Sequence, residues 1–175
     1  MDQRLKATPG IYLTGFMGCG KSTVGRLLAS KLCWSFVDLD QEIEQAEGRR
    51  IAEIFEAEGE ERFRAIEATA LKEQIRLVRG GRARVVALGG GAFVQPDNRE
   101  RLLSDGGLVV FLDVPVETLW RRIASEEHRP LASDPERFRA LYAARLPLYG
   151  QAHQTIDADR DPETIVDEIF RLSLT

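Results

Sequence analysis

The strongest constraint on the fold is the stretch GFMGCGKS at residues 15–22, because of the segments on either side of it. An apolar, β-branched run at 11–14 precedes it, and a stretch at 22–32 with its apolar residues on one helical face follows it. The glycines allow successive backbone N–H groups to point into one concavity at the start of a helix. The sequence therefore predicts a strand, a tight turn and a helix, the opening unit of a parallel sheet.

The remainder of the chain repeats this alternation of short apolar runs and longer amphipathic stretches. The apolar runs lie at residues 11–16, 35–40, 84–88, 108–114 and 154–158, and the helical patterns at 22–32, 60–78, 116–126, 134–144 and 162–172. Runs that are apolar almost throughout are typical of strands covered on both faces. We therefore expect one α/β domain over residues 1–175, with a five-stranded parallel sheet between helical layers.

Two segments fit this alternation poorly. Residues 41–59 have a charged helical pattern that Gly48 interrupts, and residues 125–135 are polar with two prolines. Such segments between regular elements favour mobile flaps over a binding site.

The composition excludes some classes of function. With 24 Lys and Arg against 28 Asp and Glu, the net charge is -4, which leaves no basic excess for a nucleic acid. Cys19 and Cys33 form no CxxC pair, so a disulfide framework is not expected. No apolar run is long enough to cross a bilayer and no signal core begins the chain, so we expect a cytoplasmic protein without a membrane partner.

The stretch at 15–22 has the spacing GxxxxGK[ST] in the strand-to-helix context that a phosphate-binding loop requires. Lys21 is placed to reach the β- and γ-phosphates of a nucleoside triphosphate, and the Ser22 hydroxyl to bind Mg²⁺. The nucleotide-binding residues expected from the loop are Gly18, Cys19, Gly20, Lys21, Ser22 and Thr23. A redox role for Cys19 is the alternative to a small tolerated side chain.

The loop alone does not identify the phosphate acceptor, but the second apolar run ends in a pair of carboxylates. Alternation places Asp38 and Asp40 on the same side of the strand end, where ligands of parallel sheets bind. One carboxylate is suited to order the water shell of Mg²⁺ and the other to orient or deprotonate an acceptor hydroxyl. The alternative is a helix cap next to a solvated acid.

The third apolar run leads into Gly89, Gly90 and Gly91, which allow a ligand to press against the backbone unless they form only a flexible turn. Arg64 shares a helical face with Glu67, which can aim its guanidinium, or the two form a surface ion pair.

Two further arginines are candidates for anion binding, with solvated basic residues as the alternative. Arg145 opens the stretch RLPLY, where Pro147 is expected to end a helix. Arg129 lies in the polar segment 125–135.

Taken together, these residues resemble the shikimate kinase family. The resemblance covers nearly the whole chain in an ordered series of motifs: GFMGCGKSTVGRLLA, DLDQEIE, IAEIFEAEGEERFRAIE, LGGGA, FLDV, RPL and RLPLY. It implies a three-layer α/β/α P-loop kinase fold and transfer of the γ-phosphate of ATP, with Mg²⁺, to the 3-hydroxyl of shikimate in aromatic amino-acid biosynthesis. It also implies an acceptor-binding segment at about 41–70 and a lid at about 122–135.

The resemblance also assigns roles on the acceptor side. It implies that Asp40 holds the acceptor hydroxyls, that Arg64 and Arg145 bind the shikimate carboxylate, and that the glycines around Gly90 contact the ring through the backbone.

On the nucleotide side, the resemblance places Asp38 behind Mg²⁺ and brings Arg129 from the lid onto ATP. The resemblance implies that adenine lies between a lid-side arginine and Pro162. Arg122 is the candidate for this arginine, with Arg121 as its competitor. Pro162 also suits a helix start after Asp161. The expected catalytic residues are Lys21, Asp40, Arg64 and Arg129.

Other functions keep part of this pattern. A kinase for another small polyol acid, such as gluconate, keeps the loop but need not keep Arg64 and Arg145 together with the triple glycine. A nucleoside monophosphate kinase must recognise a base, and a silent ATP-binding module predicts loss of Lys21, Asp40 or Arg64, all of which are present. No interface signature stands out, so we expect a monomer.

Overall fold

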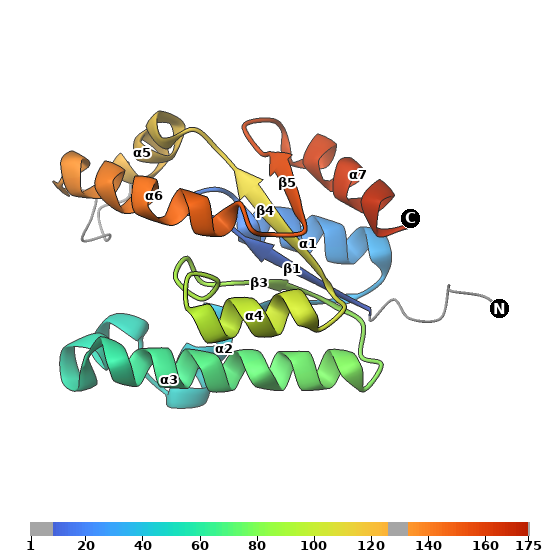
Figure 1. Ribbon diagram of the computed structural model, residues 1–175, viewed down its shortest axis with the longest axis horizontal. Helices are drawn as coiled ribbons and strands as arrows, with labels where there is room; N and C mark the ends of the chain where they lie inside the picture. Colours follow the sequence, from blue (N-terminus) through green and yellow to red (C-terminus); the bar gives the residue numbers. More distant parts are fainter. Residues whose placement is uncertain (1–8, 126–132, 175) are drawn as a thin grey trace.

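The structure is a computed structural model of the chain, which describes residues 9–125 and 133–174. Its strands are β1 (Gly10–Thr14), β2 (Ser35–Asp38), β3 (Arg84–Ala87), β4 (Leu108–Asp113) and β5 (Gln154–Asp157). Its helices are α1 (Lys21–Leu32), α2 (Leu39–Glu47), α3 (Ile51–Arg79), α4 (Pro96–Ser104), α5 (Val116–Ala124), α6 (Pro135–Tyr149) and α7 (Pro162–Ser173). The expected alternation of strands and helices is confirmed (Figure 1).

The strands form one parallel sheet in the order β2-β3-β1-β4-β5. The central strand β1 pairs with β3 on one side and with β4 on the other. From β1 the chain runs through α1 to β2 on one side of the sheet, and after β3 it crosses to β4 on the other side of β1. The strand order therefore changes direction next to β1. Ligands of open parallel sheets bind at such a switch point, beyond the carboxyl ends of the strands.

Helices cover both faces of the sheet, as two adjacent residues of β1 demonstrate. Leu13 lies against Gly25 of α1, whereas Tyr12 hydrogen-bonds to Asp105 in the turn that follows α4. Because neighbouring strand residues point to opposite faces, α1 and α4 lie on opposite sides. Helix α7 packs beside α1, and α3 packs beside α4 (Figure 1). The three-layer α/β/α prediction is confirmed.

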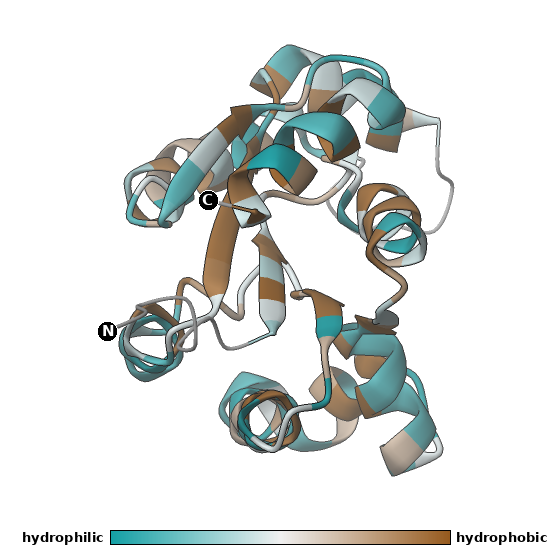
Figure 2. Ribbon diagram, turned by 90° about the vertical axis from the view of Figure 1, so that its right-hand side faces the viewer, coloured by the Kyte–Doolittle hydropathy of each residue, from teal (hydrophilic) through white to brown (hydrophobic). Residues whose placement is uncertain are grey.

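The sheet forms the centre of the core, and parts of it are among the brown, hydrophobic ribbons of Figure 2. All of β1 is buried, and so are the four central residues of β4, which explains their continuous apolar sequence. Helix α1 approaches the sheet closely at Gly25, where an added Cβ would lie 2.5 Å from the Phe36 ring. This close approach fixes the helix that carries the end of the phosphate loop.

Three local expectations were wrong. Helix α4 was not expected, because PDNRERLLS has few apolar residues and buries only Asn98 and Leu102. Strand β2 ends at Asp38, whose carboxylate caps α2, so Asp40 lies in the first turn of a helix rather than on the strand. Pro147 does not end α6, which continues to Tyr149; the missing N–H removes only one hydrogen bond of the last turns.

Helix α3 contains a break at Gly59, with φ 82° and ψ 175°, so its regular second part begins where the sequence predicted a helix at residue 60. Gly48 ends α2 in the left-handed conformation, in agreement with the interruption expected there. Within the described residues, no helix is long and apolar enough to cross a membrane.

Candidate active site

The loop between β1 and α1 has the backbone conformation that its glycines allow. Gly15, Gly18 and Gly20 have φ of 149°, 82° and 96°, and Gly20 is the N-cap of α1. A Cβ on Gly15 would lie 2.7 Å from the Cys19 Sγ and 2.9 Å from a backbone oxygen, so no other residue fits there. The loop therefore places backbone N–H groups at a helix N-terminus, where anions are stabilised.

Lys21 lies inside this loop. Its Nζ donates to the carbonyl oxygens of Gly15 at 2.7 Å and Phe16 at 3.2 Å. Cys19 is buried, with its Sγ 3.7 Å from the same amino group, which agrees with a packing role for its side chain. The ammonium group is therefore held at the centre of the loop before any phosphate is bound.

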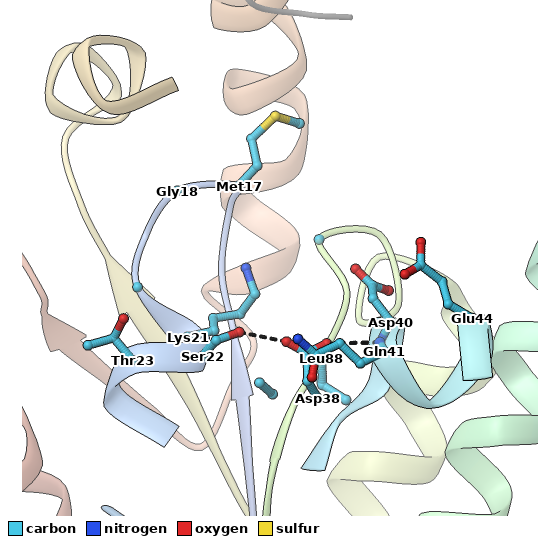
Figure 3. A pocket seen from close by; sticks show the side chains of 13 residues that line it. Met17, Gly18, Lys21, Ser22, Thr23, Asp38, Asp40, Gln41, Glu44 and Leu88 are labelled. Carbon is cyan, nitrogen blue, oxygen red and sulfur yellow. Dashed lines mark hydrogen bonds between the residues drawn. The ribbon is translucent and has the colours of Figure 1, made fainter. Parts of the chain in front are cut away.

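Ser22 and Asp38 join the loop to the end of β2. The Ser22 hydroxyl donates to Asp38 Oδ2 at 2.7 Å, while Asp38 Oδ1 accepts from the backbone of Asp40 and Gln41 at the start of α2 (Figure 3). Hydroxyl and carboxylate oxygens are the ligands that Mg²⁺ takes, so this pair fits the ion. No group of three His, Cys, Asp or Glu side chains in the described residues can hold a metal, which leaves phosphate and water to complete a coordination shell.

A cavity of about 440 Å³ opens above these residues. It is lined by the phosphate loop, the start of α2 and the end of β3: Met17, Gly18, Gly20, Lys21, Ser22, Thr23, Asp38, Asp40, Gln41, Glu44, Ala87, Leu88 and Gly90. Figure 3 shows the Lys21, Asp40 and Glu44 side chains extending toward the same side. We refer to this space as the loop cavity.

A second cavity of about 480 Å³ adjoins the first. It is lined by Met17, Asp40, Ile51, Phe55, Phe63, Arg64, Glu67, Gly89, Gly90, Gly91 and Arg145. We refer to it as the arginine cavity. Met17, Asp40 and Gly90 line both cavities, so a ligand in one meets a ligand in the other next to the Asp40 carboxylate.

The two arginines of the second cavity have different partners. Arg64 Nη1 donates to Glu67 Oε1 at 2.8 Å, and its Nη2 lies 3.5 Å from Glu60. Glu67 is almost completely buried, and burial raises the pKa of its carboxyl while Arg64 opposes that shift. Arg145 forms no ion pair with a carboxylate among residues 9–125 and 133–174. The cavity therefore holds an unneutralised guanidinium, which favours an anionic ligand.

The triple glycine allows both charged groups to approach the backbone. A Cβ on Gly91 would lie 2.5 Å from both terminal nitrogens of Arg64, and one on Gly89 would lie 2.6 Å from Asp40 Oδ1. A larger residue at either position would displace the side chain. The glycines thus act by close approach, as the sequence indicated for a ligand.

The surroundings of Asp40, taken together, oppose ionisation of its carboxyl group. Burial, followed by the charges of Asp38 and Glu44, raises the pKa of its carboxyl, while Lys21 and Arg64 lower it by less. A carboxylate with a raised pKa is a stronger base than an ordinary aspartate. Asp40 therefore combines the location and the basicity needed to accept a proton.

The structure separates Arg121 from Arg122. Arg122 Nη1 donates to the Gly18 carbonyl of the loop at 2.9 Å, whereas Arg121 bonds to Glu117 and Thr118 of its own helix. Pro162 is the first residue of α7, and Asp161 caps that helix through Thr164, as expected. The Arg129 prediction and half of the lid at 122–135 fall in 126–132, outside the described residues.

Sequence reasoning missed several residues of the site. Met17 and Glu44 line the loop cavity, and Ile51 and Phe55 line the arginine cavity, but nothing in their local patterns marks them as ligand contacts. Tyr149 is one helical turn after Arg145 and was missed because the helix was expected to end at Pro147.

A phosphate loop on a five-stranded parallel sheet of this order, joined at a shared aspartate to a cavity with two arginines, defines a P-loop kinase of small molecules. A family model described as shikimate kinase matches residues 17–173, and the chain belongs to the shikimate kinase family. The shikimate kinase of Persephonella marina is 42% identical over 162 residues, which are 91% of this chain and 96% of that protein.

Solved structures agree with this assignment. The shikimate kinase of Acinetobacter baumannii, solved in complex with shikimate, is 41% identical with a TM-score of 0.87 and covers 98% of this chain and 96% of its own. A gluconokinase from Sinorhizobium meliloti has a TM-score of 0.60 at 18% identity, covering 97% of this chain and 93% of its own. The second likeness extends to the fold alone.

Proposed function

We propose that this protein transfers the γ-phosphate of ATP to the 3-hydroxyl of shikimate. The observation that carries the proposal is the shared wall of the two cavities, where Asp40 lies between the phosphate loop and the two arginines. Membership of the shikimate kinase family supports the same choice of substrates. The two ligands then meet where one carboxylate can act on the reacting hydroxyl.

The loop cavity binds the triphosphate. Backbone N–H groups and the N-terminus of α1 hold the phosphates, and Lys21 leaves its carbonyl partners to contact the transferred group. Ser22 and Asp38 would hold Mg²⁺, which would supply charge neutralisation on the phosphate oxygens when bound. The remaining steps depend on the side chains of the chain itself.

The arginine cavity binds the acceptor. The shikimate carboxylate pairs with Arg145, which lacks an ionic partner among the described residues, and with Arg64, which Glu67 orients. Phe55 and Phe63 offer apolar surface to the carbon ring. Anchoring the carboxylate converts binding energy into alignment of the hydroxyl next to Asp40.

Asp40 then orients the 3-hydroxyl and accepts its proton as the oxygen attacks the phosphorus. Because its pKa is raised, the ionised carboxylate is a stronger proton acceptor than that of an ordinary aspartate. The segment 41–70 supplies five of the eleven residues that line the acceptor cavity and is proposed as the acceptor-binding part. The roles of Arg129 and of a lid at 122–135 rest on the family resemblance, whereas a cytoplasmic location and a monomeric state are proposed from the sequence patterns.

A coupled assay of ADP release tests the proposal with shikimate, gluconate and AMP as competing acceptors. We expect turnover with shikimate alone, and phosphorus NMR should place the new ester on the 3-hydroxyl. Lys21→Met serves as the matched inactive protein, with a loss of roughly 100- to 1000-fold in kcat. Faster turnover with gluconate would replace the proposal with the polyol-acid alternative.

A further inference from the structure

Tyr149 is the last residue of α6 and has no part in the chemistry described so far. Its side chain is completely buried, and its ring stacks on Phe111 of β4 with centroids 5.3 Å apart. The ring therefore belongs to the core. The hydroxyl, in contrast, points to the arginine cavity.

That hydroxyl lies between two groups that line the cavity. It donates to the carbonyl oxygen of Gly90. Arg145 lies one turn earlier on the same helix, and its Nη1 would be 3.5 Å from a Cβ added at Gly90, so the guanidinium is close to the same glycine. A phenol has one donor and two acceptor positions, so an oxygen that donates to Gly90 can still accept a hydrogen bond from the guanidinium. Burial raises the pKa of Tyr149 to about 12, so the donor is retained over the working range of pH.

The bond to Gly90 also fixes the orientation of a peptide group. The Gly90–Gly91 peptide is trans, like the other described peptides, so the Gly91 N–H points away from the Gly90 carbonyl. Neither Gly90 nor Gly91 uses its N–H in a hydrogen bond within residues 9–125 and 133–174. Both glycines line the cavity, so their unpaired donors are available to a ligand there.

We propose that Tyr149 is a positioning residue of the acceptor site, whose hydroxyl sets the Arg145 guanidinium at a fixed place relative to the Gly90–Gly91 peptide. The carboxylate anchor and the backbone donors then face the acceptor in a single arrangement. This inference rests on the proposed function, because it concerns how the same cavity holds shikimate. It predicts an effect on acceptor binding that leaves nucleotide binding unchanged.

Tyr149→Phe tests this inference, because it removes one oxygen and keeps the ring that stacks on Phe111. We expect the KM for shikimate to rise roughly 10- to 150-fold, the range for a lost hydrogen bond to a charged group, with the KM for ATP unchanged. Tyr142→Phe is the matched control: Tyr142 lies on the same helix, but its hydroxyl bonds at 3.3 Å to the carbonyl of Val114, which lines neither cavity. Its shikimate KM should equal that of the wild type.

A double-mutant cycle with Arg145→Met provides the second measurement. If Tyr149 acts through Arg145, the two substitutions together reduce kcat/KM by less than the product of their separate effects. Multiplicative effects, or an equal rise of both Michaelis constants in Tyr149→Phe, would overturn the inference and leave Tyr149 as a core residue. Absence of shikimate turnover in the wild type would instead remove the proposed function itself.

Discussion

Among single residues, Asp40 is the one at which the proposed activity and the stability of the fold conflict most clearly. Its carboxylate is buried beside Asp38 and Glu44, and the nearby cations compensate this only in part, so its pKa is raised. Such an ionised group costs folding free energy at neutral pH, since the unfolded chain carries it in water. Proteins commonly retain such costs at reacting positions.

Asp40→Asn should therefore raise stability and abolish most activity. The pKa of Asp40 in the folded state lies above that of an aspartate in the unfolded chain. Ionised Asp40 therefore destabilises the fold above the folded-state pKa, and the effect disappears below the unfolded-state pKa. We expect kcat to fall by roughly 100- to 10,000-fold and the melting temperature to rise at pH 7, with the gain shrinking toward pH 4. Calorimetry at both pH values checks this, and a lower melting temperature at pH 7 would contradict it.

The neighbouring pair Arg121 and Arg122 permits a matched comparison on the nucleotide side. Arg122 contacts the Gly18 carbonyl of the phosphate loop, whereas the bonds of Arg121 within the described part of the chain go to Glu117 and Thr118 of its own helix. Arg122→Ala should raise the KM for ATP roughly tenfold, the scale of one charged hydrogen bond, without changing the KM for shikimate. Arg121→Ala should behave as the wild type in steady-state kinetics; a larger effect from Arg121 would exchange the two roles.

At the scale of elements, the site depends on how closely the turn after β3 approaches α3. Arg64 of α3 reaches the backbone at Gly91 so closely that only the absence of a side chain permits it. The position of the guanidinium is therefore set jointly by a helix face and by a glycine from a different element.

Gly91→Ala should displace Arg64 without disturbing the fold. The added Cβ would lie 2.5 Å from two nitrogens at the flexible end of the arginine, so the side chain moves and its bond to Glu67 weakens. We expect a shikimate KM about tenfold higher and an unchanged KM for ATP. Gly80→Ala is the control, because an added Cβ there meets nothing closer than 3.4 Å; equal kinetics in the two variants would refute the crowding argument.

The helices and strands also show how much of the fold could be predicted from the sequence. The strands, the phosphate loop and the helix after Gly59 follow local rules of periodicity and glycine placement, so their positions were predicted correctly. Helix α4 could not be predicted, because it buries few residues and its stability depends on packing against α3 and β4. Tertiary packing also carries α6 past Pro147, and this brings Tyr149 to Gly90.

Local sequence patterns could also not predict that the two cavities share a wall. Asp40 was assigned to a strand end, and its place in the first turn of α2 follows from the capping of that helix by Asp38. The structure nevertheless brings three of the residues singled out from the sequence together, since Asp40, Arg64 and Arg145 line one cavity. Composition and spacing identify chemistry, whereas distances between elements require the packed molecule.

In the whole molecule, the two cavities of the candidate active site and a buried carboxylate cluster lie at opposite ends of the sheet. The cavities lie beyond the carboxyl ends of the strands, while near the amino end of β4 the Asp105 carboxylate is buried between two elements. Arg79 Nε, at the end of α3, donates to it at 2.5 Å, and the Tyr12 hydroxyl of β1 donates at 3.4 Å. This cluster connects a helix, a turn and the central strand.

Arg79→Met should therefore destabilise the protein and leave its kinetics unchanged. It removes the cation beside a buried carboxylate, but the Arg79 side chain is 62% exposed, so solvent screening limits the loss to about 1–3 kcal/mol. At about 2–4 °C for each kcal/mol, the melting temperature should fall measurably. Arg76→Met is the control, since Arg76 pairs with Glu73 on the exposed surface of the same helix and its loss should hardly change the melting temperature. Equal melting temperatures for the two variants would contradict the stabilising role of Arg79, and a changed shikimate KM in Arg79→Met would show that the two ends of the sheet are not independent.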